Sequence, residues 1–214
     1  MPMKQYACYL FDADGTLIDT IDLIVRCFEH TCAKFCGISV PAREIIKNVG
    51  LTLREQMERC LGPLDDERFE IILREHMGFQ RSHYREYLKV FPGVAEGLAK
   101  LTSYGKRCAV VTSRKRESLE LYLKEMEIYD YFKAFVTMET TQRHKPDPEP
   151  ALKALFLLGG KKQEALFIGD SRFDIECAAN AGIDSAFVKW SRNDPSELVV
   201  QPTMYIDDLR ELFA

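Results

Sequence analysis

Two aspartates separated by a single residue are the first side chains in the sequence whose types and spacing suit chemistry. Asp12 and Asp14 directly follow the short apolar run 6–11. In an extended strand, residues two apart face the same side and lie roughly 6.5–7 Å apart along the chain. Two carboxylates in that position repel each other unless a cation or a proton intervenes. One can therefore stay ionised and attack as a nucleophile, while the other holds a proton and serves as general acid or base.

Two more acids follow a second apolar run. Asp170 comes directly after the run 164–169, and Asp174 lies four residues further on, on the same face of a predicted helix start. Carboxylate oxygens from Asp12 and Asp170 would suit Mg²⁺, which takes one or two carboxylates together with waters and substrate phosphate. Asp174 could instead be a first-turn acid that the helix dipole favours. The sequence thus predicts a magnesium site where these acids meet.

A pair of hydroxyls and a lysine follow two other apolar runs. Thr112 and Ser113 stand at the end of the run that begins at Arg107, and Lys145 lies in the loop after 134–137. Lys145 would supply the positive charge that a transferring phosphoryl group and a nucleophilic carboxylate both need. Thr112 would offer its hydroxyl to a phosphate oxygen. These residues predict a site for a phosphorylated substrate.

The elements that must position these residues alternate between strand and helix from residue 92 to the end of the chain. Apolar runs predict buried strands, and amphipathic stretches predict helices between them. Strands are expected at 6–11, 107–112, 134–137, 164–169, 185–189 and 203–206, and helices at 94–101, 115–126, 148–158, 172–181 and 208–213. This alternation favours an α/β fold with a Rossmann-like parallel sheet and helices on both faces. Ligands of such sheets bind beyond the carboxyl ends of the strands, where the polar residues stand.

The segment 18–89 has a different pattern, because it shows helical periodicity and no convincing strand. Helices are expected at 20–36, at two short stretches within 41–60 that Gly50 separates, and at 65–88. The first strand must join the sheet from across this segment. We therefore predict an all-helical cap domain over 18–89, inserted into a catalytic core that comprises 1–17 and 90–214.

Composition and charge exclude several classes of protein. Of 214 residues, 46% are hydrophobic and 29% are charged, which is a globular balance and excludes disorder or fibre. Lys and Arg number 29 against 33 Asp and Glu, a formal net charge of −4, so neither nucleic acid nor a membrane is an expected partner. The seven cysteines are scattered through apolar segments. Their odd number indicates reduced thiols and a cytoplasmic location.

The motifs at the strand ends carry a resemblance to a known family. The stretch from Phe11 to Thr20, with both early aspartates and Gly15, resembles the first motif of the haloacid dehalogenase-like hydrolase superfamily. Thr112, Lys145 and the stretch 169–174 resemble its second, third and fourth motifs, in the same order. The stretches 144–150 and 169–182 are most similar to those of phosphoglycolate phosphatases and pyrophosphatases of this superfamily.

The resemblance implies a role for each of these residues. Asp12 would be the nucleophile that forms an aspartyl-phosphate, and Asp14 the general acid and base. Asp12, the backbone carbonyl of Asp14, and Asp170 would bind Mg²⁺. The phosphoryl group would be bound by Thr112 and Lys145, with Ser113 beside them, and Asp174 would be an outer-shell partner of the metal or of Lys145.

The helical segment holds side chains that could read the substrate. Arg54 stands where related enzymes often place a cap residue that contacts the substrate. An arginine on the solvent-exposed face of a helix is an equal alternative. His30, His76 and His83 are expected at the surface or half-buried. Because the cap closes over the site, we expect little free volume and compact substrates.

The function that follows is a Mg²⁺-dependent phosphatase for a small phosphorylated metabolite, such as a phosphoglycolate-like phosphomonoester. An inorganic pyrophosphatase of the same mechanism is the first alternative. A sugar phosphomutase is less favoured, because the segment after the first motif lacks the early histidine that related mutases carry. A dehalogenase or a phosphonate hydrolase typically lacks an aspartate at the position of Asp14.

Overall fold

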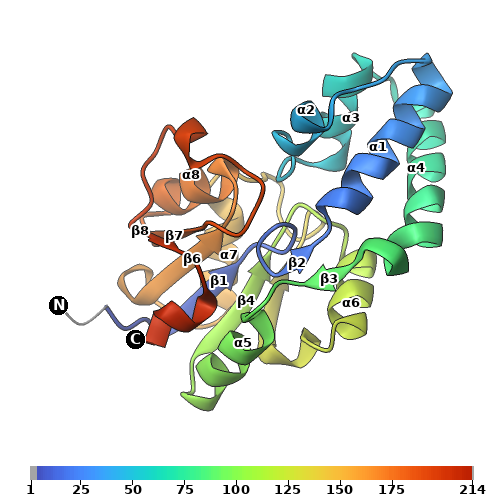
Figure 1. The fold of residues 1–214 in the computed structure, drawn as a ribbon. Helices are drawn as coiled ribbons and strands as arrows, with labels where there is room; N and C mark the ends of the chain where they lie inside the picture. The colour runs from blue at the N-terminus through green and yellow to red at the C-terminus, as the bar shows by residue number, and fades with distance from the viewer. Residues whose placement is uncertain (1–3, 214) are drawn as a thin grey trace.

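A six-stranded parallel sheet forms the centre of the molecule in the computed structural model, which describes residues 4–213 (Figure 1). Its strand order is β5-β4-β1-β6-β7-β8, and all neighbouring strands run parallel. The strands are β1 (Cys8–Phe11), β4 (Arg107–Val111), β5 (Phe132–Val136), β6 (Ala165–Gly169), β7 (Asp184–Val188) and β8 (Met204–Ile206). The predicted α/β fold with a Rossmann-like sheet is confirmed. The first strand, β1, lies between β4 and β6, in the middle of the sheet.

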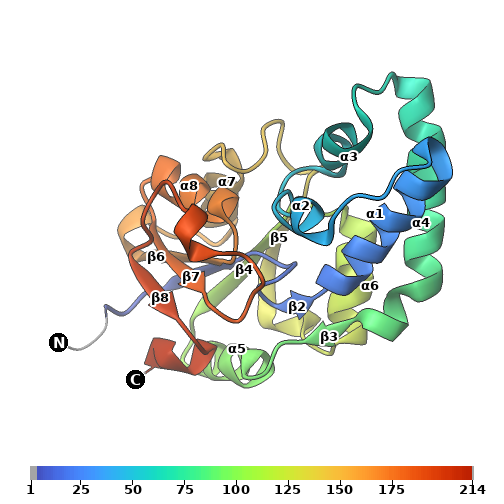
Figure 2. The same ribbon diagram turned by 45° about the horizontal axis from the view of Figure 1, so that its top comes forward.

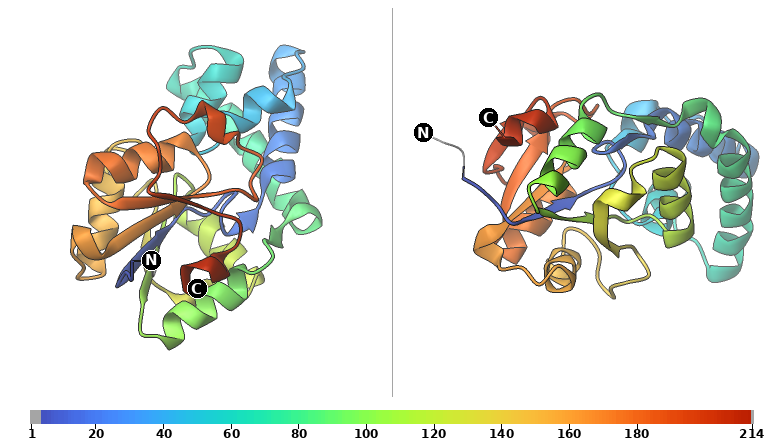
Figure 3. Two further views of the ribbon diagram at one scale, coloured as in Figure 1. Left: turned by 60° about the vertical axis from the view of Figure 1, so that its left-hand side comes forward. Right: turned by 90° about the horizontal axis from the view of Figure 1, so that it is seen from below.

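Helices cover both faces of this sheet (Figure 3). They are α5 (Val94–Ser103), α6 (Arg116–Glu125), α7 (Glu149–Leu157) and α8 (Arg172–Ala181). Alternate residues of β1 face opposite sides: Tyr9 and Phe11 pack in one apolar cluster with α5 and α6, and Cys8 and Leu10 in the other with α7 and α8. Burial on both faces explains why the strands are continuous apolar runs. Short 3₁₀ helices span Tyr129–Tyr131, Lys162–Glu164, Pro195–Glu197 and Leu209–Phe213, the last in place of the predicted closing helix.

Four helices form a separate bundle beside the sheet, which we call the helical insertion (residues 21–87; Figures 1 and 2). They are α1 (Ile21–Cys36), α2 (Ala42–Ile46), α3 (Leu53–Leu61) and α4 (Asp66–Tyr87). The insertion has its own apolar cluster, built around Phe28, Met57 and Ile72, so its helices bury their apolar faces against one another. None of the helices within residues 4–213 combines the length and the apolar character needed to cross a lipid bilayer.

A two-stranded antiparallel ribbon joins the insertion to the sheet domain. It pairs β2 (Ile18–Asp19) with β3 (Lys89–Val90), so the prediction that 18–89 contains no strand is wrong at both ends of that segment. Two residues are too few to show an alternating pattern in a sequence. The pairing arises because the chain leaves and re-enters the sheet domain at neighbouring places.

Candidate active site

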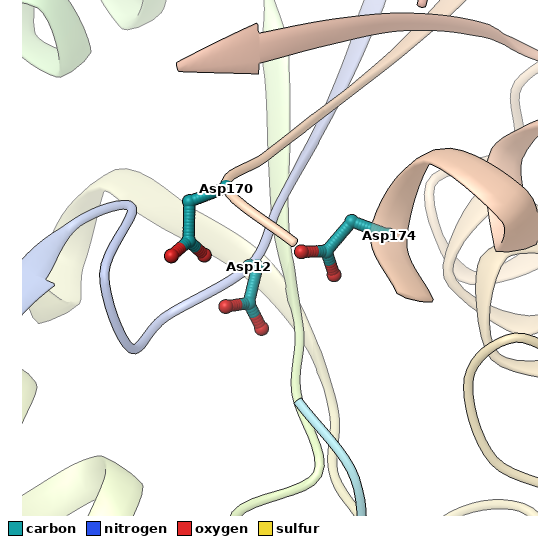
Figure 4. Close-up of side chains that lie close together, drawn as sticks. All are labelled: Asp12, Asp170 and Asp174. Carbon is teal, nitrogen blue, oxygen red and sulfur yellow. The ribbon is translucent and has the colours of Figure 1, made fainter. Parts of the chain in front are cut away.

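The carboxyl ends of two adjacent strands bring together acids that are far apart in the sequence. Asp12 follows the central strand β1, Asp170 follows β6, and Asp174 lies in the first turn of α8. One carboxylate oxygen from each lies within 4.8 Å of the other two, and all three residues are buried. Figure 4 shows the three carboxyl groups close together, with that of Asp174 directed toward that of Asp12.

Lys145 bridges two of these acids. Its Nζ donates to Oδ1 of Asp12 and to Oδ1 of Asp174, each at 2.6 Å, and the residue is only 3% exposed. Burial alone would lower the pKa of Lys145, but the two carboxylates outweigh it and raise the pKa above its usual value. The lysine is therefore a fixed cation beside Asp12.

The cluster carries more negative charge than Lys145 balances. Burial raises the pKa of Asp12 well above its usual range, with repulsion from the other acids added, although Lys145 opposes the shift. Burial, followed by repulsion from Asp174, raises the pKa of Asp170 to about 7. A divalent cation would relieve both effects, and carboxylate oxygens are the ligands that Mg²⁺ prefers. The donor set therefore fits a magnesium ion.

Neighbouring polar side chains hold the carboxylate of Asp170 in place. Oδ1 of Asp170 accepts from the Thr16 hydroxyl at 3.2 Å, and Oδ2 accepts from Ser191 at 2.7 Å and Asn193 at 2.8 Å. These bonds fix the Asp170 carboxylate next to β1.

Both oxygens of the Asp174 carboxylate accept hydrogen bonds. Its Oδ2 accepts from the backbone N–H and the hydroxyl of Ser171, at 3.0 and 2.6 Å, in a capping box at the start of α8. Its Oδ1 accepts from Lys145. Because both oxygens already accept bonds, Asp174 positions Lys145 and caps α8 at once.

A glycine allows the chain after β1 to pass this cluster. Gly15 has a φ of 85°, and a Cβ at this position would collide with the carboxylate of Asp170. The left-handed conformation and the close approach both require glycine here. Another residue would force β1 and β6 apart at the edge where their acids meet.

Asp14 is held by an arginine that the sequence analysis missed. Arg114 donates from Nε to Oδ2 of Asp14 at 3.0 Å and from Nη2 to Oδ1 at 2.5 Å, and the Thr20 hydroxyl also donates to Oδ1. Burial would raise the pKa of Asp14, but Arg114 outweighs it and holds the pKa below its usual value. Arg114 comes two residues after Thr112, so its place after a strand end was the signal that could have found it.

The two hydroxyl residues have different surroundings. Thr112 is buried, and its Oγ1 accepts from the backbone N–H of Arg114 at 3.1 Å. The Ser113 hydroxyl donates to the carbonyl oxygen of Gly50 at 2.6 Å. Ser113 therefore links the end of β4 to the helical insertion.

A cavity of about 250 Å³ lies between this edge of the sheet and the helical insertion. Asp12, Asp14 and Thr112 line it on the sheet side. Most of the remaining surface is apolar and comes from nine side chains: Ile24, Phe28, Val49, Leu51, Leu53, Phe69, Leu73, Met77 and Met138. Polar residues also line it, among them Gln56, Glu70, Gln80, Lys115 and Ser118. The expectation of little free volume is therefore wrong, because the insertion packs around the site without filling it. We call this space the cap cavity.

Arg54 and His76 are among the insertion residues that line the cap cavity. Arg54 lines it, but its guanidinium is paired with Glu58 and Asp66 and lies over the ring of Phe69. His76 is 2% exposed rather than at the surface or half-buried as expected. Its Nδ1 lies 3.0 Å from the Thr31 hydroxyl, and burial lowers its pKa to about 3, so the imidazole is neutral. Helical periodicity alone did not show that α4 turns this face toward α1.

Known proteins resemble this chain both in sequence and in structure. Residues 9–188 match the family described as "Haloacid dehalogenase-like hydrolase". The chain is 40% identical over 205 residues to "Putative pyrophosphatase PpaX" of Caldanaerobacter subterraneus subsp. tengcongensis, covering 95% of this chain and 91% of that protein. It is 31% identical over 204 residues to "Pyrophosphatase PpaX" of Bacillus cereus, covering 95% and 93%. A haloacid dehalogenase-like hydrolase structure from Bacteroides fragilis superposes with a TM-score of 0.90 at 28% identity, covering 97% of this chain and 100% of that one.

Proposed function

Because the chain belongs to the haloacid dehalogenase-like hydrolase family, we propose that it is a Mg²⁺-dependent phosphatase that hydrolyses a small, phosphoglycolate-like phosphate monoester through an aspartyl-phosphate. The observation that carries this proposal is the buried Asp12 carboxylate, paired with Lys145 at 2.6 Å at the carboxyl end of the central strand. A carboxylate held beside a fixed cation is suited to attack a phosphoryl group, whose negative charge would otherwise repel it.

The reaction runs in two steps on the residues described. Lys145 bonds Oδ1 of Asp12, which leaves Oδ2 to attack phosphorus. The bond from Oδ2 to phosphorus forms while the bond from phosphorus to the ester oxygen breaks, and Asp14 gives its proton to that oxygen. Asp14 then takes a proton from water, which attacks phosphorus, releases inorganic phosphate and restores Asp12. Because Arg114 holds Asp14 ionised, Asp14 can act as an acid only when this ion pair opens.

Mg²⁺ would be held by Asp12, Asp170 and the backbone carbonyl of Asp14. When bound, the ion neutralises charge on the phosphoryl oxygens and on the acids around them. Thr112 and Lys145 would bind the phosphoryl group. Ser113 and Arg54, also proposed as substrate-binding residues, would first have to give up their bonds to Gly50 and to the acids around Arg54.

The helical insertion would act as the cap of the enzyme. We assign 18–89 to the cap and 1–17 with 90–214 to the catalytic core, with the ribbon of β2 and β3 at the boundary. The seven free cysteines support a reducing, cytoplasmic setting. We propose a small phosphorylated metabolite as the substrate, and neither nucleic acid nor a membrane as a partner.

Inorganic pyrophosphate is a second candidate substrate. Two relatives that are 40% and 31% identical over almost the whole chain carry the name pyrophosphatase. The same two steps would apply, with inorganic phosphate as the leaving group.

A phosphate-release screen tests the proposal. The purified protein with Mg²⁺ is incubated with phosphomonoesters, including 2-phosphoglycolate, and with pyrophosphate. We expect release of inorganic phosphate, and we expect Asp12→Asn to lose it by several orders of magnitude while remaining folded, as circular dichroism would show. Asp12→Asn activity above a few per cent of wild type would exclude Asp12 as the nucleophile. Rearranged sugar phosphate or halide that forms faster than phosphate would overturn the hydrolase assignment.

A further inference from the structure

We infer that the preferred substrate is a phosphate monoester whose leaving group is apolar and uncharged, with the size of a ring or a branched chain, and that this group occupies the cap cavity. The inference rests on the proposed phosphatase function and keeps its mechanism, but it departs from the phosphoglycolate-like substrate proposed above. Glycolate and inorganic phosphate are charged leaving groups, which the cap cavity would disfavour.

The position of the cap cavity makes its lining relevant to the leaving group. The same cavity is lined by Asp12, the proposed nucleophile, by Asp14, the proposed acid, and by Thr112. A phosphoryl group bound at these residues would direct its ester oxygen toward Asp14 and the remainder of the substrate into the cavity. The substrate therefore meets the apolar side chains of the insertion directly.

Those side chains come from several separate parts of the insertion. Phe28 lies on α1, Leu51 precedes α3, and Leu73 and Met77 lie on α4. Met138, from the loop after β5, adds an apolar side chain from the core. Convergence of apolar groups from distant segments with a few polar ones is typical of a binding site for a mostly apolar ligand.

The charges around the cavity do not suit a second anion. Its buried or half-buried cations within residues 4–213 are already paired, Arg114 with Asp14 and Arg54 with Glu58 and Asp66. His76 is neutral, so Lys115, which is exposed, is the lining cation that makes no ion pair among residues 4–213. A carboxylate or a second phosphate held among the apolar side chains, away from that exposed lysine, would have no charged partner, which is costly.

The volume of the cavity favours a group larger than glycolate. About 250 Å³ is more than the roughly 150 Å³ in which an apolar protein cavity holds benzene. A benzyl group would fill much of the space and remove water from the apolar wall.

The first experiment compares two substrates that differ by one charge. The wild-type protein with Mg²⁺ is assayed for kcat/KM on benzyl phosphate and 4-carboxybenzyl phosphate, with 2-phosphoglycolate and pyrophosphate alongside. We expect kcat/KM for benzyl phosphate to exceed that for each of the three substrates with charged leaving groups by about 10-fold or more. Equal or higher kcat/KM for any of them would overturn the inference.

A charge placed in the cavity provides a second experiment. Met77→Lys introduces a cation into the cavity wall, and Ile71→Lys introduces the same charge on the same helix at a side chain that is 50% exposed. We expect Met77→Lys to lower the preference for benzyl over 4-carboxybenzyl phosphate by about 10-fold, and Ile71→Lys to leave it unchanged. An unchanged preference in a folded Met77→Lys protein, or an equal change in both variants, would contradict the placement of the leaving group.

A binding measurement separates this inference from the proposed function. Benzylphosphonate and 4-carboxybenzylphosphonate cannot be hydrolysed, so calorimetry reports their binding without chemistry. If benzylphosphonate binds about 10-fold more tightly while no ester releases phosphate, the cavity assignment stands and the phosphatase proposal fails. If esters are hydrolysed but the two phosphonates bind equally, the phosphatase proposal stands and the cavity assignment fails.

Discussion

Three buried carboxylates and one buried lysine share the carboxyl edge of the sheet, and their mutual charge determines how each behaves. Lys145 contacts Asp12 and Asp174 but does not contact Asp170, whose oxygens accept bonds from neutral side chains instead. Burial, followed by repulsion from Asp174, raises the pKa of Asp170, and the bonds from Ser191 and Asn193 offset this only in part. At this scale the site is short of positive charge until a cation binds.

The shortage of positive charge around Asp170 should make the free energy of unfolding depend on pH. The pKa of Asp170 rises from 3.8 to about 7 on folding, so between these values the folded protein holds a proton that the unfolded chain has lost. Stability from this group is therefore lost as the pH rises through 7. In excess chelator, we expect Asp170→Asn to gain stability over wild type, and to gain more at pH 8 than at pH 5.

Urea unfolding at the two pH values measures this difference. Asp194→Asn is the control, because Asp194 is exposed and its pKa is lowered by the backbone N–H of Ser196. A gain for Asp170→Asn that is the same at both pH values would mean that Asp170 is already ionised at pH 5.

The Arg114–Asp14 pair is a second feature at the residue scale. Both side chains are nearly buried, at 8% and 13% exposed, so removing one leaves the other without a partner. We expect Arg114→Met to lower the free energy of unfolding by about 3 kcal/mol. Arg114→Met combined with Asp14→Asn should cost less than the sum of the two single changes, because no unpaired charge remains.

Chemical denaturation of the two single variants and the double variant measures the interaction free energy between Arg114 and Asp14. Arg210→Met serves as the control, since it removes an arginine–aspartate pair on the exposed surface. If the costs of the two single changes simply add, Arg114 does not balance the charge of Asp14.

At the scale of elements, two helices begin with the same capping box but serve different purposes. Thr52 and Glu55 start α3 in the insertion, and Ser171 and Asp174 start α8 beside the acids. In α8 the capping acid also accepts from Lys145. One box is structural, whereas the other also orients a residue of the proposed site.

This difference predicts unequal effects of the same substitution. Thr52→Ala and Ser171→Ala should each cost about 1 kcal/mol of stability, because each removes a hydroxyl that caps a helix. Only Ser171→Ala should also lower kcat, by about 10-fold, because it loosens the acid that positions Lys145. Thermal unfolding and phosphate release measure the two effects. Equal kcat in the two variants would show that the cap of α8 does not matter for catalysis.

The elements also show where sequence patterns suffice. Buried strands such as β4 and β6 were predictable, because burial on both faces makes a continuous apolar run. The gathering of Asp12 and Asp170 followed from the rule that places ligands at strand ends. The ribbon of β2 and β3 was not predictable, because its pairing depends on where a distant segment returns. The burial of His76 was missed for the same reason, since it depends on how α4 packs on α1.

At the scale of the whole molecule, the proposed metal site lies on the sheet domain and the cap cavity lies between that domain and the insertion. The two parts also meet through the bond from Ser113 to Gly50 and the ion pair of Arg192 with Asp22. Because the residues proposed to hold the cation all lie on the sheet domain, cation binding should stabilise that domain whether or not the cavity is filled.

Metal exchange tests this expectation. Mg²⁺ at about 100 times its dissociation constant should raise the free energy of unfolding by about 2.7 kcal/mol and restore activity lost in chelator. Ca²⁺, which accepts more ligands at longer distances, should also stabilise the fold but inhibit turnover, because it would bind both oxygens of Asp12 and so block attack. Full activity in excess chelator would exclude the metal assignment.

The ribbon of β2 and β3 has a consequence for how such a protein can diversify. Ile18 pairs with Val90, so the chain leaves for the insertion and returns from it across a gap of about 5 Å, the spacing of neighbouring strands. Because the two ends of the insertion lie next to each other, the insertion can be replaced by a segment of different length without moving the residues that flank it. The insertion can therefore change while the catalytic edge stays the same. Exchanging residues 21–87 between relatives leaves Thr20 and its bond to Asp14 in place, so it should transfer substrate preference without changing the chemistry.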